Sequence, residues 1–335
     1  MTMSAKPPAS VGLRIPDFFI VGHEKCGTTA LFNLLRQHPQ IFMPDLKEPR
    51  FFYRDRLQPD AAEQSAGVGE DLRPRTLEAY LSLFVDAGLE QRAGEASPQY
   101  IRSHDAARLI AQVQPDARII AVLREPTSLV RTFHLNNLLA LVETERDLRK
   151  AIALEQPRRQ GIDIPSGSRA PDRLFYCEHV RYVEQLRRFD SHFPAEQILV
   201  IVYDDFRRDN DATLRRILRF LDVDDTYSFE PVGATRVRKA VRLPRLHRAA
   251  LALQRARRRP AAAGRLSRTF DALTPGLLRS DAVENVLRRL VFAVPPPPDE
   301  QLVLELRRRF KPEVLALSEY LGRDLVREWG YERID

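Results

Sequence analysis

The sequence has little cysteine, no long apolar run and, over one segment, no acidic residue. Cys26 and Cys177 are the only cysteines among 335 residues, too few for a disulfide framework or a four-thiolate zinc site. No stretch approaches the roughly 20 consecutive apolar residues of a membrane-spanning helix. The first apolar run, Phe18 to Gly22, is too short for the core of a secretory signal. These absences exclude a disulfide-stapled miniprotein and a zinc ribbon, and they predict a cytoplasmic protein.

Acidic residues are missing between Arg236 and Arg268, where 12 side chains are Lys or Arg. The whole chain has a net charge of only +7, so its basicity is concentrated in this segment. Such a segment attracts phosphate, sulfate or an acidic surface, whatever the fold does. Two interpretations stay open for residues 236–268: a solvated and partly mobile basic arm, or a contact surface for an acidic acceptor or an anionic membrane.

The remaining composition is that of a globular protein. Hydrophobic residues make up 44% and charged residues 30% of the chain, which is typical of soluble domains. A length of 335 residues corresponds to roughly two average domains, but α/β folds with long loops often use this much chain for one. We expect residues 1–15 to be a disordered N-terminus and residues 16–335 to form a single domain.

Short apolar runs alternate with helical patterns along the chain. Strands are expected at residues 17–22, 93–96, 117–123 and 198–203. Helices are expected from Thr28 to Pro39 and at residues 77–85, 106–113, 127–141, 177–192 and 300–329. A long loop is expected at residues 43–75 and a charged surface stretch before Arg158. This alternation predicts an α/β fold in which a P-loop-like parallel β-sheet is flanked by helices on both faces.

The first candidate site is the loop GHEKCGTT, residues 22–29, where the first strand passes into the first helix. Glycines let backbone amides turn toward a ligand, a helix N-terminus favours an anion, and Lys25 adds a positive charge. The candidate residues of this phosphate cradle are Gly22, Lys25, Cys26, Gly27, Thr28 and Thr29. A nucleotide kinase or triphosphatase is an alternative, but its P-loop has Lys directly after the last Gly, whereas Lys25 precedes Gly27 by two residues.

The second candidate site, KEPRFF at residues 47–52, places the acid Glu48 between the bases Lys47 and Arg50. A carboxylate held by two bases beside bulky apolar groups can be positioned as a general base. Without the loop at residues 22–29, this pattern would be more typical of a surface ion-pair cluster.

The third candidate site begins at Arg124, at the carboxyl end of the strand expected at residues 117–123. Ligands of open α/β sheets bind at the carboxyl ends of the strands. Arg124 and the hydroxyl of Thr132 would form a second anion site, because both donors suit phosphate oxygens. The alternative is an arginine that pairs with Glu125 or Asp116 at the start of the helix.

Together the three motifs resemble the sulfotransferases that use 3′-phosphoadenosine 5′-phosphosulfate (PAPS), most closely the bacterial and heparan-sulfate-type branch. The loop at residues 22–29 is similar to that family's 5′-phosphosulfate loop, and Arg124-x-Pro126 followed by Thr132 is similar to its 3′-phosphate motif. Residues 47–52 are similar to its acceptor-side catalytic motif, and GEASPQY at residues 94–100 to another segment near the acceptor. The resemblance covers about residues 16–230 and, more weakly, the C-terminal end. Ala96 departs from it, because heparan-type members often carry Lys there.

The resemblance implies transfer of the sulfuryl group from PAPS to a hydroxyl, or an amine, of a carbohydrate, a glycolipid or another small metabolite. It implies Lys25 and Glu48 as catalytic residues, with Glu48 taking the acceptor proton and Lys25 neutralising charge on the leaving phosphate. The implied donor contacts are the loop residues, Arg124 and Thr132, with Arg238 and Lys239 closing over the 3′-phosphate. The implied acceptor contacts are Lys47, Arg50, Glu95 and Ser97.

Several alternatives to these roles stay open. Glu95 and His104 compete with Glu48 as the base, and His23 and His134 are the other histidines near the motifs. No metal is expected, because the sequence has no cluster of His and Cys ligands. A non-enzymatic anion-binding or nucleic-acid-binding protein could use residues 236–268, but the cradle and Glu48 would then have no purpose, so nucleic acid is not the expected partner.

Overall fold

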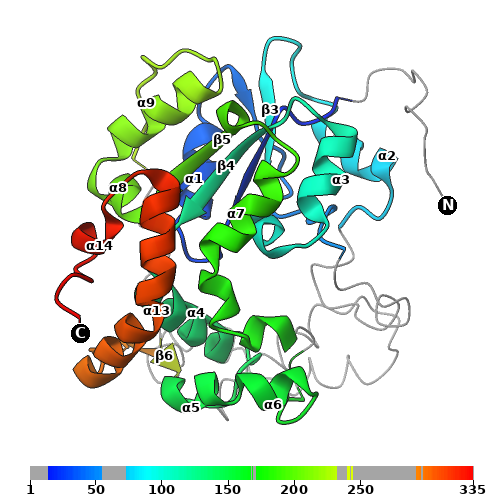
Figure 1. Cartoon of the computed structure of the whole chain (residues 1–335). Coiled ribbons are helices and arrows are strands. Elements are labelled where there is room, and N and C mark those ends of the chain that lie inside the picture. The colour runs from blue at the N-terminus through cyan, green and yellow to red at the C-terminus, as the bar shows by residue number, and fades with distance from the viewer. Residues whose placement is uncertain are drawn as a thin grey trace, which may run out of the picture.

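The computed structural model describes residues 14–54, 73–166, 168, 171–231, 240–241, 243, 292–295 and 297–334. At its centre lies a five-stranded sheet (Figure 1) with the order β2-β3-β1-β4-β5, in which every neighbouring pair is parallel. The strands are β1 (Phe18–Gly22), β2 (Ile41–Phe42), β3 (Arg92–Ala96), β4 (Arg118–Leu123) and β5 (Ile198–Val202). The predicted parallel α/β sheet is therefore confirmed. Residues 1–13 of the expected disordered N-terminus and most of the basic segment 236–268 fall outside the described residues.

The central strands are buried along nearly their whole length, which explains their continuous apolar sequences. β1 reads FFIVG and is completely buried, and it lies between β3 and β4. Ile20 pairs with Ala96 on one side and Ile120 on the other. A Cβ atom at Gly94 of β3 would lie 2.1 Å from the ring of Phe18, so glycine is required there for the two strands to pack.

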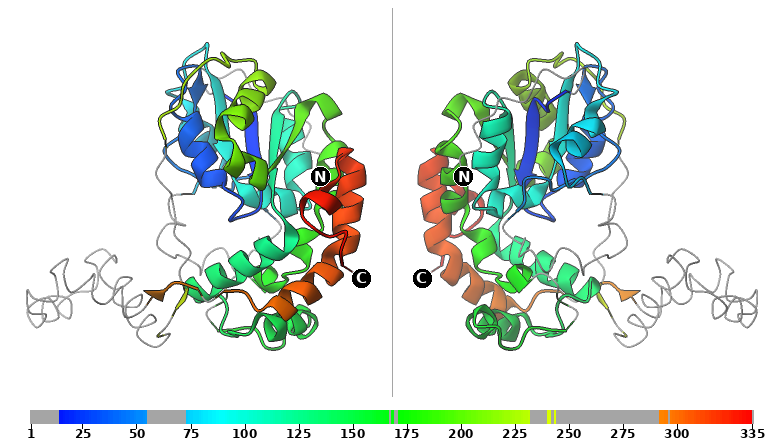
Figure 2. Two further views of the ribbon diagram at one scale, coloured as in Figure 1. Left: turned by 90° about the vertical axis from the view of Figure 1, so that its left-hand side faces the viewer. Right: turned by 90° about the vertical axis from the view of Figure 1, so that its right-hand side faces the viewer.

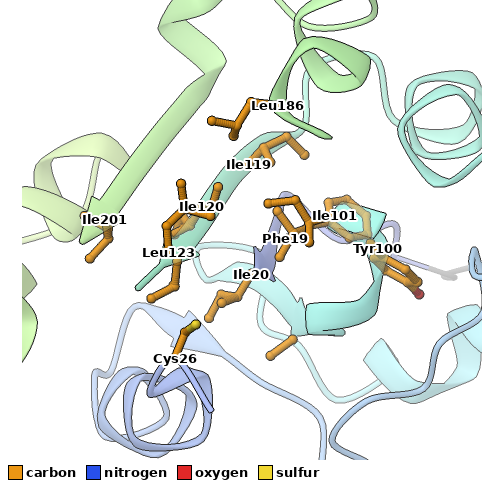
Figure 3. Close-up of a cluster of buried hydrophobic side chains, with 14 of the residues drawn as sticks. Phe19, Ile20, Cys26, Tyr100, Ile101, Ile119, Ile120, Leu123, Leu186 and Ile201 are labelled. Atoms are coloured by element: carbon orange, nitrogen blue, oxygen red, sulfur yellow. The ribbon is translucent and has the colours of Figure 1, made fainter. Parts of the chain in front are cut away.

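Helices cover both faces of the sheet. The helices are α1 (Thr28–Leu35), α2 (Leu77–Leu81), α3 (Ala106–Val113), α4 (Pro126–Leu139), α5 (Leu148–Ala153), α6 (Glu155–Arg159), α7 (Tyr182–Asp190), α8 (Tyr203–Arg208), α9 (Asn210–Phe220), α13 (Glu300–Leu321) and α14 (Leu325–Glu328). Figure 2 shows α1 and α9 on one side of the sheet and α3 and α7 on the other. In Figure 3, Leu186 of α7 and Cys26, next to α1, lie on opposite sides of β4. Both faces are therefore closed to solvent, as the apolar strands predict.

Shorter elements complete the fold. Five 3₁₀ helices lie among the described residues: η1 (Ser82–Phe84), η2 (Pro98–Arg102), η3 (Pro171–Leu174), η4 (Glu178–Val180) and η5 (Ala195–Gln197). A separate antiparallel pair is formed by β6 (Ala240–Val241) and β7 (Phe292–Ala293). None of the helices in the described part of the chain is both long enough and apolar enough to cross a membrane.

The order of the strands places a binding site beyond their carboxyl ends. From β1 the chain passes to β2 at one edge of the sheet, and from β4 it passes to β5 at the other. Because the two neighbouring strands send their connections in opposite directions, a crevice opens between the loops that follow them. Helices α4, α5 and α6 lie beyond the carboxyl ends of the strands (Figures 1 and 2).

A sequence expectation about one helix was wrong. The single helix expected at residues 177–192 is interrupted at Arg181, whose ψ of 59° is not helical. The break separates η4 from α7, and the Tyr182 hydroxyl donates to the carbonyl oxygen of Arg124 over 2.6 Å. Tertiary contacts thus override an amphipathic period that extends through the break.

The charged stretch through Arg158 contains the helices α5 and α6, and it lies only partly on the surface: Arg146, Asp147, Arg149 and Lys150 are exposed, but not all of its charges are. Glu143 and Arg158 are buried because they are paired: Arg158 donates to both carboxyl oxygens of Glu143, over 2.7 and 2.8 Å. The Tyr176 hydroxyl gives Glu143 a further hydrogen bond of 3.0 Å. A buried ion pair persists when hydrogen bonds satisfy both partners, and one sequence does not show which charges will meet.

Candidate active site

The loop between β1 and α1 depends on its two glycines. Gly22 has φ 135°, and a Cβ atom there would lie 2.3 Å from the carbonyl oxygen of Val122 in β4. Gly27 has φ 84°, and a Cβ atom there would lie 2.9 Å from the Tyr203 ring. Only glycine fits both positions. Between them Lys25 has φ 75°, a left-handed conformation that is uncommon for residues other than glycine.

The N-terminus of α1 has the form of an anion site. Gly27 is its N-cap and makes no side-chain capping hydrogen bond, so the first amides of the helix are left for a ligand. Thr28 and Thr29 are the first two residues of α1, and Thr28 is buried. Cys26 is also buried, and burial raises the pKa of its thiol to about 12. Its thiol therefore stays protonated, and a donor contact at this position would come from the backbone.

His23 is buried beneath this loop. It is 2% exposed, and its Nε2 lies 2.8 Å from Oε1 of Gln185 in α7. Burial, together with the charge of Arg102, lowers its pKa to about 3. His23 is therefore a neutral, buried group that joins the loop to α7.

Arg124 lies directly beside the loop. Its guanidinium donates to the carbonyl oxygen of Lys25 over 2.9 Å and to the hydroxyl of Ser128 over 2.7 Å. It also lies 4.7 Å from the centre of the Tyr203 ring, the ring that lies against Gly27. Glu125 does not pair with Arg124 but caps α4, where it accepts hydrogen bonds from the amides of Thr127 and Ser128. Arg124 therefore lies beside the loop, and the anion site that it would form there stays a prediction.

The hydroxyl beside Arg124 is that of Ser128 and not that of Thr132. Thr132 lies one turn further along α4, and its hydroxyl donates to the carbonyl oxygen of Ser128 over 2.7 Å. Ser128 was visible in the sequence only as an early residue of this helix. The spacing of four residues brings it onto the face that Arg124 covers.

The loop at residues 47–52 holds Glu48 in an ionised state. Glu48 has φ 59° and Arg50 has φ 55°, so two further non-glycine residues are left-handed. Burial would raise the pKa of Glu48, but Lys47 and Arg50 outweigh burial and lower it to about 2. Lys47 Nζ lies 2.8 Å from Glu48 Oε1, and Arg50 donates to the other carboxyl oxygen. The predicted cluster of one acid and two bases is therefore formed.

Glu95 and Ser97 lie under this loop. Both are completely buried. Ser97 accepts a hydrogen bond from the backbone amide of Arg50 over 3.1 Å, so it holds the loop in place. Burial raises the pKa of Glu95 to about 8, although the hydroxyls of Tyr100, Tyr80 and Ser97 act in the opposite direction. In the described structure both residues are therefore buried behind the loop at residues 47–52.

Three polar residues of the site carried no signal of their own in the sequence. Gln99 donates to Glu24 over 2.7 Å and to Glu48 over 3.0 Å. Arg173, from η3, lies 2.7 Å from the other oxygen of Glu24. Burial alone would raise the pKa of Glu24, but Arg173 and Arg102 hold it well below its usual range. Glu24 lies in the motif at residues 22–29 and Gln99 in the motif at residues 94–100. No sequence motif included Arg173.

The other candidates lie apart from these contacts. His134 is buried, and its Nε2 lies 2.8 Å from the carbonyl oxygen of Glu145. His104 is exposed at the end of η2. Arg238 and Lys239 lie outside the described residues. Among the residues that the structure describes, no three His, Cys, Asp or Glu side chains gather as metal ligands would.

A pocket lies on the α1 side of the loop. It is lined by Ala30 and Leu34 of α1, Phe206 of α8, the start of α9, and residues 229–231. Phe206 also lies close to Gly27, since a Cβ atom there would be 3.5 Å from its ring. The pocket therefore adjoins the loop through a shared aromatic side chain.

Comparisons with known proteins agree with this geometry. Residues 16–227 match the family model described as the sulfotransferase family. Human heparan sulfate glucosamine 3-O-sulfotransferase 3A1 is 25% identical over 227 residues, 66% of this chain and 49% of that protein. Human heparan sulfate glucosamine 3-O-sulfotransferase 6 is 32% identical over 115 residues, 34% of this chain and 28% of that protein. The matched region thus spans about half or less of these relatives.

A solved structure is similar over nearly its whole length. The sulfotransferase from Alicyclobacillus acidocaldarius has a TM-score of 0.63 and 26% sequence identity, and the match covers 93% of this chain and 98% of that one. The family match includes the loop after β1, the loop at residues 47–52 and Arg124, which are the segments that form the site. This chain belongs to the sulfotransferase family.

Proposed function

We propose that this protein transfers the sulfuryl group of PAPS to a hydroxyl, or an amine, of a carbohydrate, a glycolipid or another small metabolite. The observation that carries the proposal is the contact of Arg124 with the Lys25 carbonyl at 2.9 Å. It joins two anion sites into one, and PAPS carries two separate phosphate groups. Glu48 lies at the same end of the sheet. Hydrogen bonds through Gln99 and Glu24 link it to the loop at residues 22–29.

The donor would lie across the loop and α4. The amides at the start of α1, with Thr28 and Thr29, would hold the 5′-phosphosulfate. Arg124, with the hydroxyls of Ser128 and Thr132, would hold the 3′-phosphate. ATP has no 3′-phosphate, so these contacts would select PAPS over ATP. The pocket beside Phe206 and Ala30 would take the adenine ring, since nucleotide bases bind in apolar clefts that carry an aromatic side chain.

The chemical step would be an in-line displacement at sulfur. The acceptor oxygen forms the new S–O bond as its proton passes to the Glu48 carboxylate. The S–O bond to the 5′-phosphate breaks, and its electron pair stays on the phosphate oxygen to give adenosine 3′,5′-bisphosphate (PAP). Lys25, held in a fixed conformation beside the phosphate, would stabilise the charge that develops there.

The acceptor side is polar and already neutralised. Four cations near Glu24 and Glu48 each contact a carboxylate. These contacts are Lys47 and Arg50 with Glu48, Arg102 with Asp172, and Arg173 with Glu24. Such a surface suits the hydroxyls of a carbohydrate, which can both donate and accept hydrogen bonds. Paired cations are less suited to a polyanionic chain, so a neutral saccharide or glycolipid is the acceptor we favour.

Calorimetry separates the proposed activity from its alternatives. PAP should bind more tightly than ADP if the site is built for PAPS, whereas a kinase or triphosphatase would prefer ADP with a metal ion. Tight binding of DNA together with weak binding of both nucleotides would favour a nucleic-acid-binding protein that uses residues 236–268. Screening neutral and anionic saccharides with labelled PAPS would then identify the acceptor. Transfer to none of them, together with absent PAP binding, would contradict the proposal.

A further inference from the structure

Two carboxylates of the site share a single donor. Nε2 of Gln99 lies 2.7 Å from Oε1 of Glu24 and 3.0 Å from Oε2 of Glu48. A primary amide has two N–H groups, so Gln99 can donate to both carboxylates at once. The reverse orientation of the amide would set its carbonyl oxygen against two negative charges. Gln99 is only 2% exposed, so solvent does not compete for either hydrogen bond.

Glu24 is also held by Arg173. The guanidinium of Arg173 donates to Oε1 of Glu24 over 2.8 Å, the oxygen that also accepts from Gln99, and lies 2.7 Å from Oε2. The same guanidinium donates to the side-chain oxygen of Asn137 in α4, over 3.1 and 3.3 Å, and lies 5.0 Å from the centre of the Phe133 ring. Glu24 is therefore fixed between the helix α4 and the residue that contacts Glu48.

Gln99 connects the carboxylate of Glu48 directly to the loop after β1. The hydrogen bonds of Glu48 to Lys47 and Arg50 lie within its own loop. They keep the carboxylate ionised, and the loop itself is held by Ser97 and by the ion pair of Arg50 with Glu24 at 3.7 Å. Among the hydrogen bonds of Glu48 in the described structure, the one from Gln99 leaves that loop. Gln99 in turn binds Glu24, the residue directly before Lys25.

We propose that Glu24 is a positioning residue, which sets the position of the base Glu48 relative to Lys25 through Gln99. The inference rests on the sulfuryl transfer proposed above. In an in-line displacement the base and the group that stabilises the leaving oxygen act at opposite ends of the reacting bonds, so the spacing between them matters. A displacement of about 1 Å between reacting groups can lower a rate by about 10²-fold. Glu24 ties both ends to one another.

The test uses substitutions that keep the charge. Glu24→Asp retains the carboxylate but is one methylene shorter, so it cannot span both Gln99 and Arg173. We expect turnover of labelled PAPS to fall by about 10-fold or more, while the Kd for PAP stays within about twofold of the parent. Turnover is measured with the acceptor found in the screen and as hydrolysis, in which water attacks sulfur to give sulfate and PAP. Glu184→Asp is the matched control, because Glu184 pairs with Arg188 on the surface of α7 and should leave turnover unchanged.

A double variant distinguishes positioning through Gln99 from a general structural role. If Glu24 acts through Gln99, the variant with both Glu24→Asp and Gln99→Ala should be no slower than Gln99→Ala alone. Independent effects would instead multiply, and multiplied losses would overturn the inference, as would a Glu24→Asp enzyme with full turnover. If Glu24→Asp does not fold, Gln99→Ala carries the test with the same expected split between turnover and PAP affinity. A parent enzyme that neither binds PAP nor consumes PAPS would contradict the proposed function, whereas an active parent with a fully active Glu24→Asp variant would contradict only the positioning role.

Discussion

The guanidinium of Arg124 donates a hydrogen bond of 2.9 Å to the backbone carbonyl of Lys25, a residue 99 positions earlier in the chain. The two residues follow β4 and β1, which are neighbours in the sheet. This contact holds the left-handed backbone of Lys25 against the start of α4. It also brings a fixed guanidinium beside the N-terminus of α1, where we propose that both contact one ligand with two phosphate groups.

Substitution of Lys25 by Ala should remove most of the turnover. In the proposed step Lys25 stabilises charge on the leaving phosphate oxygen, and the loss of one preorganised donor commonly lowers a rate by about 10²–10³-fold. The measurement is transfer from labelled PAPS under single-turnover conditions, with circular dichroism to show that the variant is folded. A folded Lys25→Ala protein with near-normal transfer would show that the role is misassigned.

Substitution of Arg124 by Ala should weaken the binding of PAP much more than that of AMP. PAP alone carries a 3′-phosphate, and a hydrogen bond to a charged group contributes about 1.5–3 kcal/mol. Both affinities can be measured by calorimetry. Because Arg124 also binds the Lys25 carbonyl, a smaller loss for AMP is expected as well. Equal losses for the two ligands would mean that Arg124 only supports the loop.

Substitution of Glu48 by Gln should abolish transfer and leave PAP binding intact. Gln keeps the size and the hydrogen bonding of Glu but cannot accept a proton, and a positioned base accounts for about 10²–10⁴-fold in rate. Because the pKa of Glu48 is lowered to about 2, its protonation should not reduce the parent rate near neutral pH. The rate should fall from this cause only as the pH approaches 2. If Glu48→Gln stays active while His104→Ala or Glu95→Gln loses transfer, the base is one of those residues.

Glu95 should make the stability of the protein depend on pH. Its pKa is raised from 4.5 to about 8 by burial, so between these values the folded protein binds a proton that the unfolded chain releases. Stability from this group is therefore complete below pH 4.5 and declines as the pH rises toward 8. Glu95→Gln removes this decline, so its melting temperature relative to the parent should rise between pH 5 and pH 8. Scanning calorimetry across that range tests the sign, and a constant difference would contradict the raised pKa.

Most of the fold could be predicted from local sequence patterns. The apolar runs at β1, β4 and β5 predicted buried parallel strands because a strand covered on both faces needs apolar residues at every position. The glycines and Lys25 between β1 and α1 predicted an anion site, since the required backbone conformations and the helix N-terminus are local properties. These features depend on residues within a few positions of one another, and one sequence is enough to identify them.

Other features could be seen only in the tertiary structure. They are the break at Arg181, the buried pair of Glu143 and Arg158, and the hydrogen bond of Arg124 with Ser128. The same is true of the contacts that Gln99 makes with Glu24 and Glu48. The sequence motifs identified the segments that contain Glu24, Glu48 and Gln99, but they did not predict the distances between these side chains. Those distances depend on how separate loops pack at one edge of the sheet, and side-chain hydrogen bonds form or fail over differences of a few tenths of an ångström.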